Sequence, residues 1–164
     1  MPSALEILFP LPATNDYRGS RYPLAAFYLL LATKIFSSSV HLFKDDSGVN
    51  SIATIIVFPF DGAADPNNII YMFSAVGGVT QMMFTLLYLL VLWRYRSLIP
   101  LMLCFMLLES LLGLVATGLH PLTPEYFEHT PPALAARLPK LILLPVLAAW
   151  AIHSSRSNWP QEAS

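Results

Sequence analysis

The sequence predicts an all-α integral membrane protein, a four-helix bundle with a short interfacial or re-entrant segment between helices 1 and 2. Hydrophobic residues make up 55% of the 164 positions and charged residues only 12%, which is too apolar for a soluble domain of this size. Four apolar stretches also reach the length of about 20 residues that crosses a hydrocarbon core of roughly 30 Å. We expect one transmembrane domain over residues 1–164, with helices at 22–43, 69–93, 98–118 and 133–152.

Helix-breaking residues mark the ends of the first two helices. The run Lys44 to Gly48 closes the first, and Asp65 to Asn68 opens the second. Between them, residues 51–60 (SIATIIVFPF) are apolar but too few to cross a membrane, and Pro59 ends the run. We expect this segment to lie in the membrane interface or to re-enter the bundle.

The lengths of the remaining connections indicate how the helices follow one another. Only Arg94 to Ser97 join the second helix to the third, so we expect these two to be antiparallel neighbours. The third and fourth are separated by residues 120–132, a run too rich in proline to be helical throughout. The leader before the first helix lacks a basic start and contains Pro10 and Pro12, so we expect it to be retained rather than cleaved as a signal.

Basic residues beside the helices indicate an orientation, because cytoplasmic loops of membrane proteins are enriched in Lys and Arg. Placing the turn between the second and third helices inside puts both termini inside as well. We therefore expect cytoplasmic termini and a bacterial inner membrane location. Five basic residues then lie inside and three outside: Arg18, Arg21, Arg94, Arg96 and Arg156 against Lys44, Arg137 and Lys140.

Composition and spacing argue against several kinds of function. The net charge of −1 and the lack of a basic cluster argue against nucleic acid. Cys104 is the single cysteine and can form neither an internal disulfide nor a multi-cysteine metal site. His41 and His120 lie near the outer helix ends without ligand spacing such as HExxH, so we interpret them as interfacial residues rather than metal or haem ligands. No catalytic set is visible, which favours a non-enzymatic protein.

Two charged side chains, Lys34 and Glu109, fall inside predicted helices. A charge at the centre of a membrane helix costs about 2.5 to 3.5 kcal/mol on insertion scales. Lys34 and Glu109 each follow an inner arginine by 13 residues, and Gln81 precedes one by 13. At the helical rise per residue, all three reach a level roughly 20 Å above the inner arginines. We therefore predict an intramembrane polar cluster of Lys34, Gln81 and Glu109.

Small and polar residues continue this cluster along each helix at helical spacing. Because small residues let helix backbones approach closely in lipid, we expect the faces that carry them to meet inside the bundle. The candidate contributors are Ser38, His41, Ser74, Gly77, Gly78 and Gly113.

Three interpretations of the cluster are open. Lys34 and Glu109 can form a structural ion pair, assisted by Gln81, that sets which helices meet. The three residues can instead line a polar cavity for a ligand, a proton or a lipid headgroup. In the third, the flexible stem of Lys34 carries its charge away to the interface.

The order of elements resembles a known family. A first span and an apolar non-spanning piece precede DPNNIIYMFSAVGGVTQMMFTLLYLLVLWRYRSLIPLMLCFMLLESLLGL, which combines an Asp-Pro start, a glycine-bearing helix, a basic turn and a third helix. This layout is similar to the DoxX-like group of small bacterial membrane proteins with four helices, over residues 20–152 in layout and 65–118 in pattern. The resemblance implies a protein of no assigned activity, in a group where some members are membrane subunits of quinone-linked oxidoreductases or stress-response assemblies. It assigns no catalytic residue.

Three functions follow as hypotheses. The first is a non-enzymatic accessory or anchoring component of a membrane complex, whose partners are membrane lipids, other subunits or a second copy of the chain. The second is a membrane-embedded binding protein or enzyme for a quinone or lipid, which uses Lys34, Gln81 and Glu109. The third is a small transporter. We expect no cofactor other than a quinone or lipid, and no metal.

Overall fold

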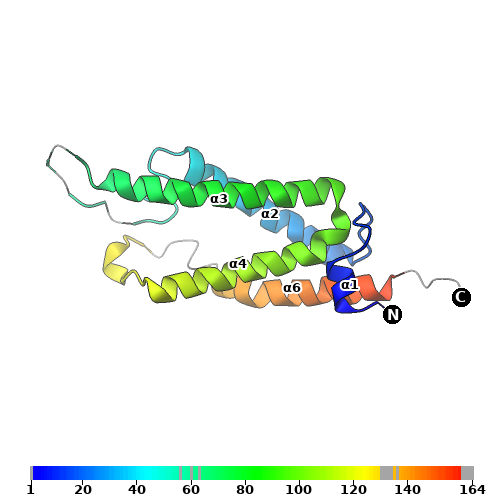
Figure 1. The fold of residues 1–164 in the computed structure, drawn as a ribbon. Helices are drawn as coiled ribbons and strands as arrows, with labels where there is room; N and C mark the ends of the chain where they lie inside the picture. The colour runs from blue at the N-terminus through cyan, green and yellow to red at the C-terminus, as the bar shows by residue number, and fades with distance from the viewer. Residues whose placement is uncertain are drawn as a thin grey trace, which may run out of the picture.

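Four long helices form the body of the protein (Figure 1). In this computed structural model, each is long and apolar enough to cross a membrane. This confirms the expected all-α fold with four helices of membrane-spanning length. Within the described residues the structure is otherwise short helices, turns and one isolated β-bridge. The structure describes residues 2–55, 57–59, 61–62, 64–129, 135 and 137–159. The long helices are α2 (Arg21–Phe43), α3 (Asn67–Arg94), α4 (Ile99–Leu119) and α6 (Arg137–Ser157).

The helix ends lie close to the breaking residues in the sequence. At the start of α2 the Ser20 side chain accepts a hydrogen bond from the Tyr22 N–H, and α2 ends where the Lys44 N–H donates to the Val40 carbonyl. The chain turns sharply after it because Ser47 and Gly48 both have positive φ angles. The expected start of the fourth helix, residue 133, lies outside the described residues, whereas α6 continues to Ser157, five residues beyond the expected end at 152.

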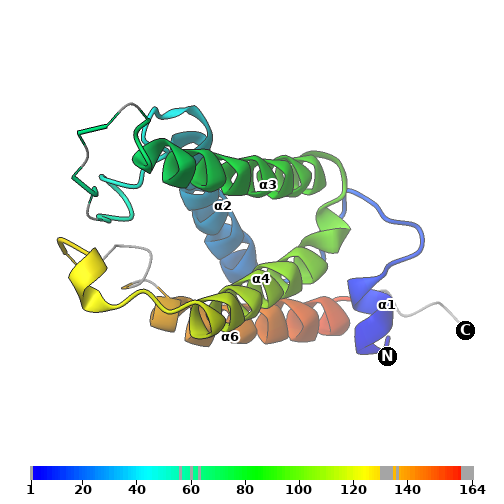
Figure 2. The ribbon, with the colours of Figure 1, turned by 60° about the vertical axis from the view of Figure 1, so that its left-hand side comes forward.

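The long helices associate as two pairs, α2 with α3 and α4 with α6. Figure 2 shows α4 inclined away from α3. The link between α3 and α4 is a 3-10 turn, η1 (Arg96–Leu98), and the two helices make few contacts with each other. Our expectation that a short link makes them packed neighbours is therefore wrong over most of their length, because α4 runs along α6 instead.

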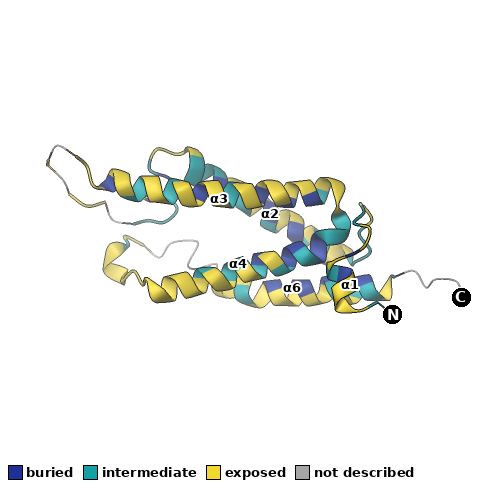
Figure 3. Cartoon of the chain, viewed as in Figure 1, coloured by how far each residue is buried: buried dark blue, intermediate teal, exposed yellow. Residues whose placement is uncertain are grey.

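The buried core lies at one end of the bundle. We call this the terminal end, because the short helix near the N-terminus and the end of α6 lie there, and the opposite end the loop end (Figures 1 and 3). In lipid these side chains stabilise the bundle by close contact between atoms, since surrounding hydrocarbon is as apolar as they are. The core consists of Phe27, Leu31, Tyr88, Val91, Ile99, Met102, Leu103, Met106, Leu144, Leu147, Ala148 and Ala151.

At the loop end, two connections bind the helix pairs to each other. The Glu128 N–H donates to the Thr54 carbonyl at 3.0 Å, and the Thr54 hydroxyl donates to the His129 carbonyl at 2.7 Å. Beside them, Ile55 and Phe127 form the antiparallel bridge. The described part of segment 51–60 therefore consists of turns, the bridge at Ile55 and irregular backbone at the end of the bundle, and residues 56 and 60 lie outside the description.

A short helix, α1 (Ala4–Leu8), covers part of the terminal end. Its capping box is complete: the Ser3 hydroxyl accepts from the Glu6 N–H while the Glu6 carboxylate accepts from the Ser3 N–H. Ile7 is buried against the bundle, whereas Leu5 and Phe9 are exposed. The leader is thus fastened to the bundle through one face of α1.

The two adjacent glycines of α3 differ in surroundings, and this difference is a test of helix contact. A Cβ on Gly78 would lie 2.8 Å from the His41 carbonyl carbon of α2, whereas a Cβ on Gly77 would meet no other atom of the described chain within 4 Å. We expect Gly78→Ala to lower the free energy of unfolding in detergent by about 1 to 3 kcal/mol, because α2 and α3 must separate. Gly77→Ala is the matched control and should leave the unfolding midpoint nearly unchanged; equal effects would contradict the close approach at Gly78.

Candidate functional site

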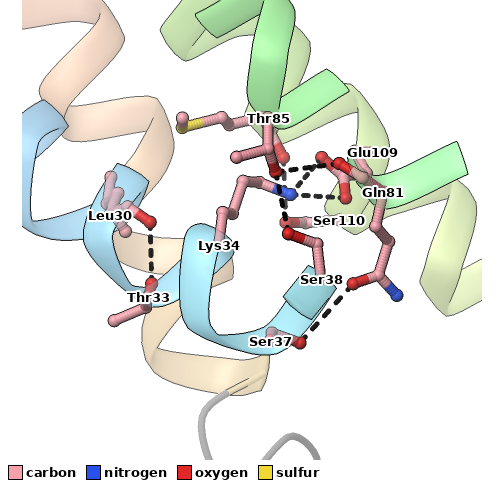
Figure 4. A network of polar contacts seen from close by, with 10 residues as sticks. Leu30, Thr33, Lys34, Ser37, Ser38, Gln81, Thr85, Glu109 and Ser110 are labelled. Atoms are coloured by element: carbon pink, nitrogen blue, oxygen red, sulfur yellow. Dashed lines mark hydrogen bonds and ion pairs between the residues drawn. The ribbon is translucent and has the colours of Figure 1, made fainter. Parts of the chain in front are cut away.

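Lys34 and Glu109, each near the middle of its helix, form an ion pair. Figure 4 shows the two side chains pointing toward one another. The Lys34 Nζ donates to both carboxylate oxygens of Glu109, each at 2.6 Å. Lys34 belongs to α2 and Glu109 to α4, so the contact joins one helix pair to the other. It lies just beyond the core, and the side chains remain 23% and 38% exposed. The structure thus brings together two of the three residues of the predicted polar cluster.

Tyr88 is the residue of α3 that accompanies this pair. The Lys34 Nζ lies 5.8 Å from the centroid of its ring, within the range of a cation–π contact. The Tyr88 ring also packs edge-on against Phe27, with centroids 6.1 Å apart. Tyr88 was not among the predicted residues, although it shares a helix face with Gln81 and Thr85: Thr85 follows Gln81 by four residues and Tyr88 follows Thr85 by three.

Gln81 does not take the expected place beside the pair. Its side-chain oxygen accepts instead a hydrogen bond from the Ser37 hydroxyl at 3.5 Å (Figure 4). The expectation counted residues from the arginines and treated the helices as parallel. Because α2 crosses α3 at an angle (Figure 1), the Lys34 ammonium meets the ring of Tyr88, about two turns nearer the terminal end than Gln81.

Polar and small residues form a seam between α2 and α3, and the predicted contributors Ser38, Ser74 and Gly78 belong to it. The buried Thr85 hydroxyl donates to Ser38 at 3.4 Å. Further toward the loop end, Ser74 donates to the Ser47 carbonyl at 3.4 Å. Gly78 also belongs to this seam, where it lets the backbone of α3 lie close to that of α2. Each hydroxyl thus has a partner within the helix pair, which a polar group in lipid requires.

Two glycines expected to support helix contact lie elsewhere. A Cβ on Gly113 of α4 would meet no atom of the described residues within 4 Å, and the same holds for Gly77. Their assignment to a packed interior face is wrong, because α4 makes few contacts with α3 and because Gly77 does not share the face on which Gly78 meets α2. Spacing along a helix identifies a face but not the neighbour that the face meets.

The histidines stay close to the backbone. The His41 Nδ1 lies 2.8 Å from the Ser47 carbonyl, and the Ser47 hydroxyl donates to the His41 carbonyl, so this ring belongs to the end of α2. His120 is exposed just after α4. In the part of the chain that the structure describes, no three His, Cys, Asp or Glu side chains gather as a metal site.

Comparison with known proteins adds no identity to this geometry. No protein-family model, curated protein or solved structure matches the chain.

The pair acts as a bond between helices. A lone ammonium or carboxylate at this depth is costly, and placing both oxygens of Glu109 on one Nζ neutralises the two charges against each other. The pair can also be opened, because neither side chain is fully enclosed. The arrangement therefore holds α2 against α4 while leaving the charges reachable from the space around the helices.

Charge reversal tests the pair. We expect Lys34→Glu and Glu109→Lys each to lower the free energy of unfolding in detergent by about 2 to 3 kcal/mol, since each leaves like charges facing one another at membrane depth. The double swap should recover most of the loss, as measured by a double-mutant cycle of unfolding midpoints.

An exposed ion pair supplies the control. Lys44 lies 3.3 Å from Asp46 in the turn after α2, outside the helix, and Lys44→Glu should change stability by about 1 kcal/mol or less. A Glu109→Gln protein as stable as the wild type would show that the intramembrane charge is not needed for folding.

Proposed function

We propose that this chain is a non-enzymatic membrane protein that acts as an accessory or anchoring component of a larger membrane complex. The observation that carries the proposal is the Lys34–Glu109 contact, in which the two intramembrane charges satisfy each other and join the two helix pairs. Charges engaged in this way serve to hold a shape. A rigid arrangement of helices is what a membrane anchor presents to its partner.

The surface offered to a partner is the loop-end half of α4. Its large apolar side chains are exposed, and Gly113 among them leaves room for the backbone of another helix. Association of helices in lipid depends on such close backbone approach. The exposed side chains are Leu111, Leu112, Leu114, Val115 and Leu119.

Location and orientation belong to the same proposal. We place the protein in a bacterial inner membrane with both termini in the cytoplasm, and within the DoxX-like group on the layout of its helices. The helix α1 and the end of α6 lie at one end of the bundle (Figure 1), where the basic turn around Arg94 and Arg96 also lies. Lys44 and Arg137 lie at the opposite end, so the arginine-rich end is the one that the positive-inside rule assigns to the cytoplasm.

A second function is favoured by the exposure of the ion pair. Lys34 and Glu109 are reachable at the level where the helix pairs diverge, and Gln81 directs its amide nitrogen away from the pair (Figure 4). A quinone or lipid carrying hydrogen-bonding oxygens can therefore meet donors there. In this alternative, lipid extracted from the purified protein contains one enriched compound, which Glu109→Gln removes while the fold persists.

The anchoring function predicts a helix-mediated association. We expect the full chain, solubilised in mild detergent, to elute with a membrane partner or with a second copy of itself. Gly113→Leu should reduce this association about tenfold without lowering the unfolding midpoint, because the new side chain enters space that a partner helix would occupy. Gly77→Leu, at the other open glycine, is the matched control and should retain the partner. A monodisperse monomer of the wild type would contradict the proposal.

A further inference from the structure

A cavity lies at the terminal end, between the leader, η1 and the end of α6. Its volume is about 220 Å³. One water molecule occupies about 30 Å³ of liquid, so the cavity is larger than one or two water molecules need and has room for a small polar group. The polar residues of its wall are Thr14, Asp16, Arg18, Ser97 and Ser155, with Trp159 among the apolar ones.

Hydrogen bonds between distant segments hold this wall in place. The Thr14 N–H donates to the Ser97 hydroxyl at 2.9 Å, and the Ser97 N–H donates to the Thr14 carbonyl at 3.1 Å. Further along, the Asn158 side chain donates to the Arg18 carbonyl at 2.8 Å. The leader is thus tied to η1 and to the end of α6, so the cavity is formed before any ligand enters.

One wall of the cavity carries both a cation and an anion. The Arg18 Nε donates to an Asp16 carboxylate oxygen at 3.0 Å, while the Arg18 guanidinium lies 4.7 Å above the Trp159 ring. This bond uses neither the Nη groups of Arg18 nor the second oxygen of Asp16, and these atoms make no hydrogen bond among the described residues. Donors and an acceptor of full charge therefore remain available side by side.

Ser155 adds a buried polar group to the same cavity. It is only 5% exposed, lines the cavity, and its hydroxyl makes no hydrogen bond among the residues that the structure describes. A hydroxyl in the cavity wall with no partner among the described residues can donate a hydrogen bond to a ligand there.

The cavity lies at a level suited to lipid headgroups. Tyr22 and Trp150 stack at the same end of the bundle with ring centroids 5.3 Å apart, and aromatic rings of this kind favour the membrane–water boundary. Next to the cavity, Leu5, Phe9 and Leu11 are exposed, Leu11 almost completely at 97%. Apolar side chains beside a charged cavity match a molecule with a polar head and an apolar tail.

We propose that this cavity binds the headgroup of a phospholipid with a phosphate and a primary ammonium, that is, of the phosphoethanolamine type. The phosphate receives hydrogen bonds from the Arg18 Nη groups and Ser155, and the ammonium donates to Asp16. The acyl chains run over Leu11 and Phe9. A purely anionic headgroup leaves Asp16 facing negative charge, and a choline headgroup cannot donate a hydrogen bond to it.

Native mass spectrometry of the purified full chain tests this site, with lipids of identical acyl chains and ethanolamine, choline or glycerol headgroups. The ethanolamine lipid should be retained preferentially. Arg18→Gln and Asp16→Asn should each weaken its retention about tenfold, the effect of removing one hydrogen bond to a charged group. Arg94→Gln, an exposed arginine at the same end that does not line the cavity, is the control and should retain the lipid fully.

The other outcomes overturn the proposal. Equal retention of the glycerol lipid, with no effect of Asp16→Asn, would show a general anion site. Equal binding of water-soluble glycerophosphoethanolamine would show that the acyl chains and the apolar rim take no part, so that the ligand is a free metabolite. Unfolding midpoints measured without lipid identify a variant that is merely unstable; Asp16, with a side chain 65% exposed, then provides the decisive comparison.

Discussion

The salt bridge between Lys34 and Glu109 is the contact on which the arrangement of the helices depends. Neither charge is affordable alone in hydrocarbon, and each needs a partner at the same depth on another helix. Because Lys34 lies on α2 and Glu109 on α4, satisfying both brings the two helix pairs together beyond their common core. Hydrophobic side chains cannot supply such selectivity, since a leucine contacts a lipid tail as readily as a neighbouring helix.

The size and polarity of the side chains explain why α2 and α3 pack closely while the loop-end face of α4 is left exposed. The faces of α2 and α3 carry serines, a threonine and Gly78, so their backbones approach closely and their hydroxyls bond across the seam. The face of α4 beyond Glu109 is large and aliphatic, and it is left exposed at the loop end. There the helix pairs are held instead by the connections, through Thr54 and the residues after Tyr126.

The meeting of Lys34 and Glu109 was predictable from their distance along the chain from the inner arginines. The constant rise of a helix per residue converts such a residue count into a depth in the membrane. This count placed Lys34 and Glu109 at one level, where the structure joins them. The same count failed for Gln81, which bonds Ser37 instead. Equal residue counts give equal depths only when helices are parallel, and α2 crosses α3 at an angle. It also gave no sign of Tyr88, whose ring reaches the Lys34 ammonium from nearer the terminal end.

The sequence by itself determined four membrane helices, their approximate ends and the two charges that must pair, because hydropathy, helix-breaking residues and depth are local properties of the chain. Only the tertiary structure decided that α4 runs along α6 rather than α3, and that Gly78 is in contact while Gly113 is open. The cavity beneath the leader is also a feature that only the tertiary structure decides. It depends on the bonds of Thr14 to Ser97, which lie 83 residues apart. Such contacts follow from helix angles and long-range connections, which no local pattern encodes.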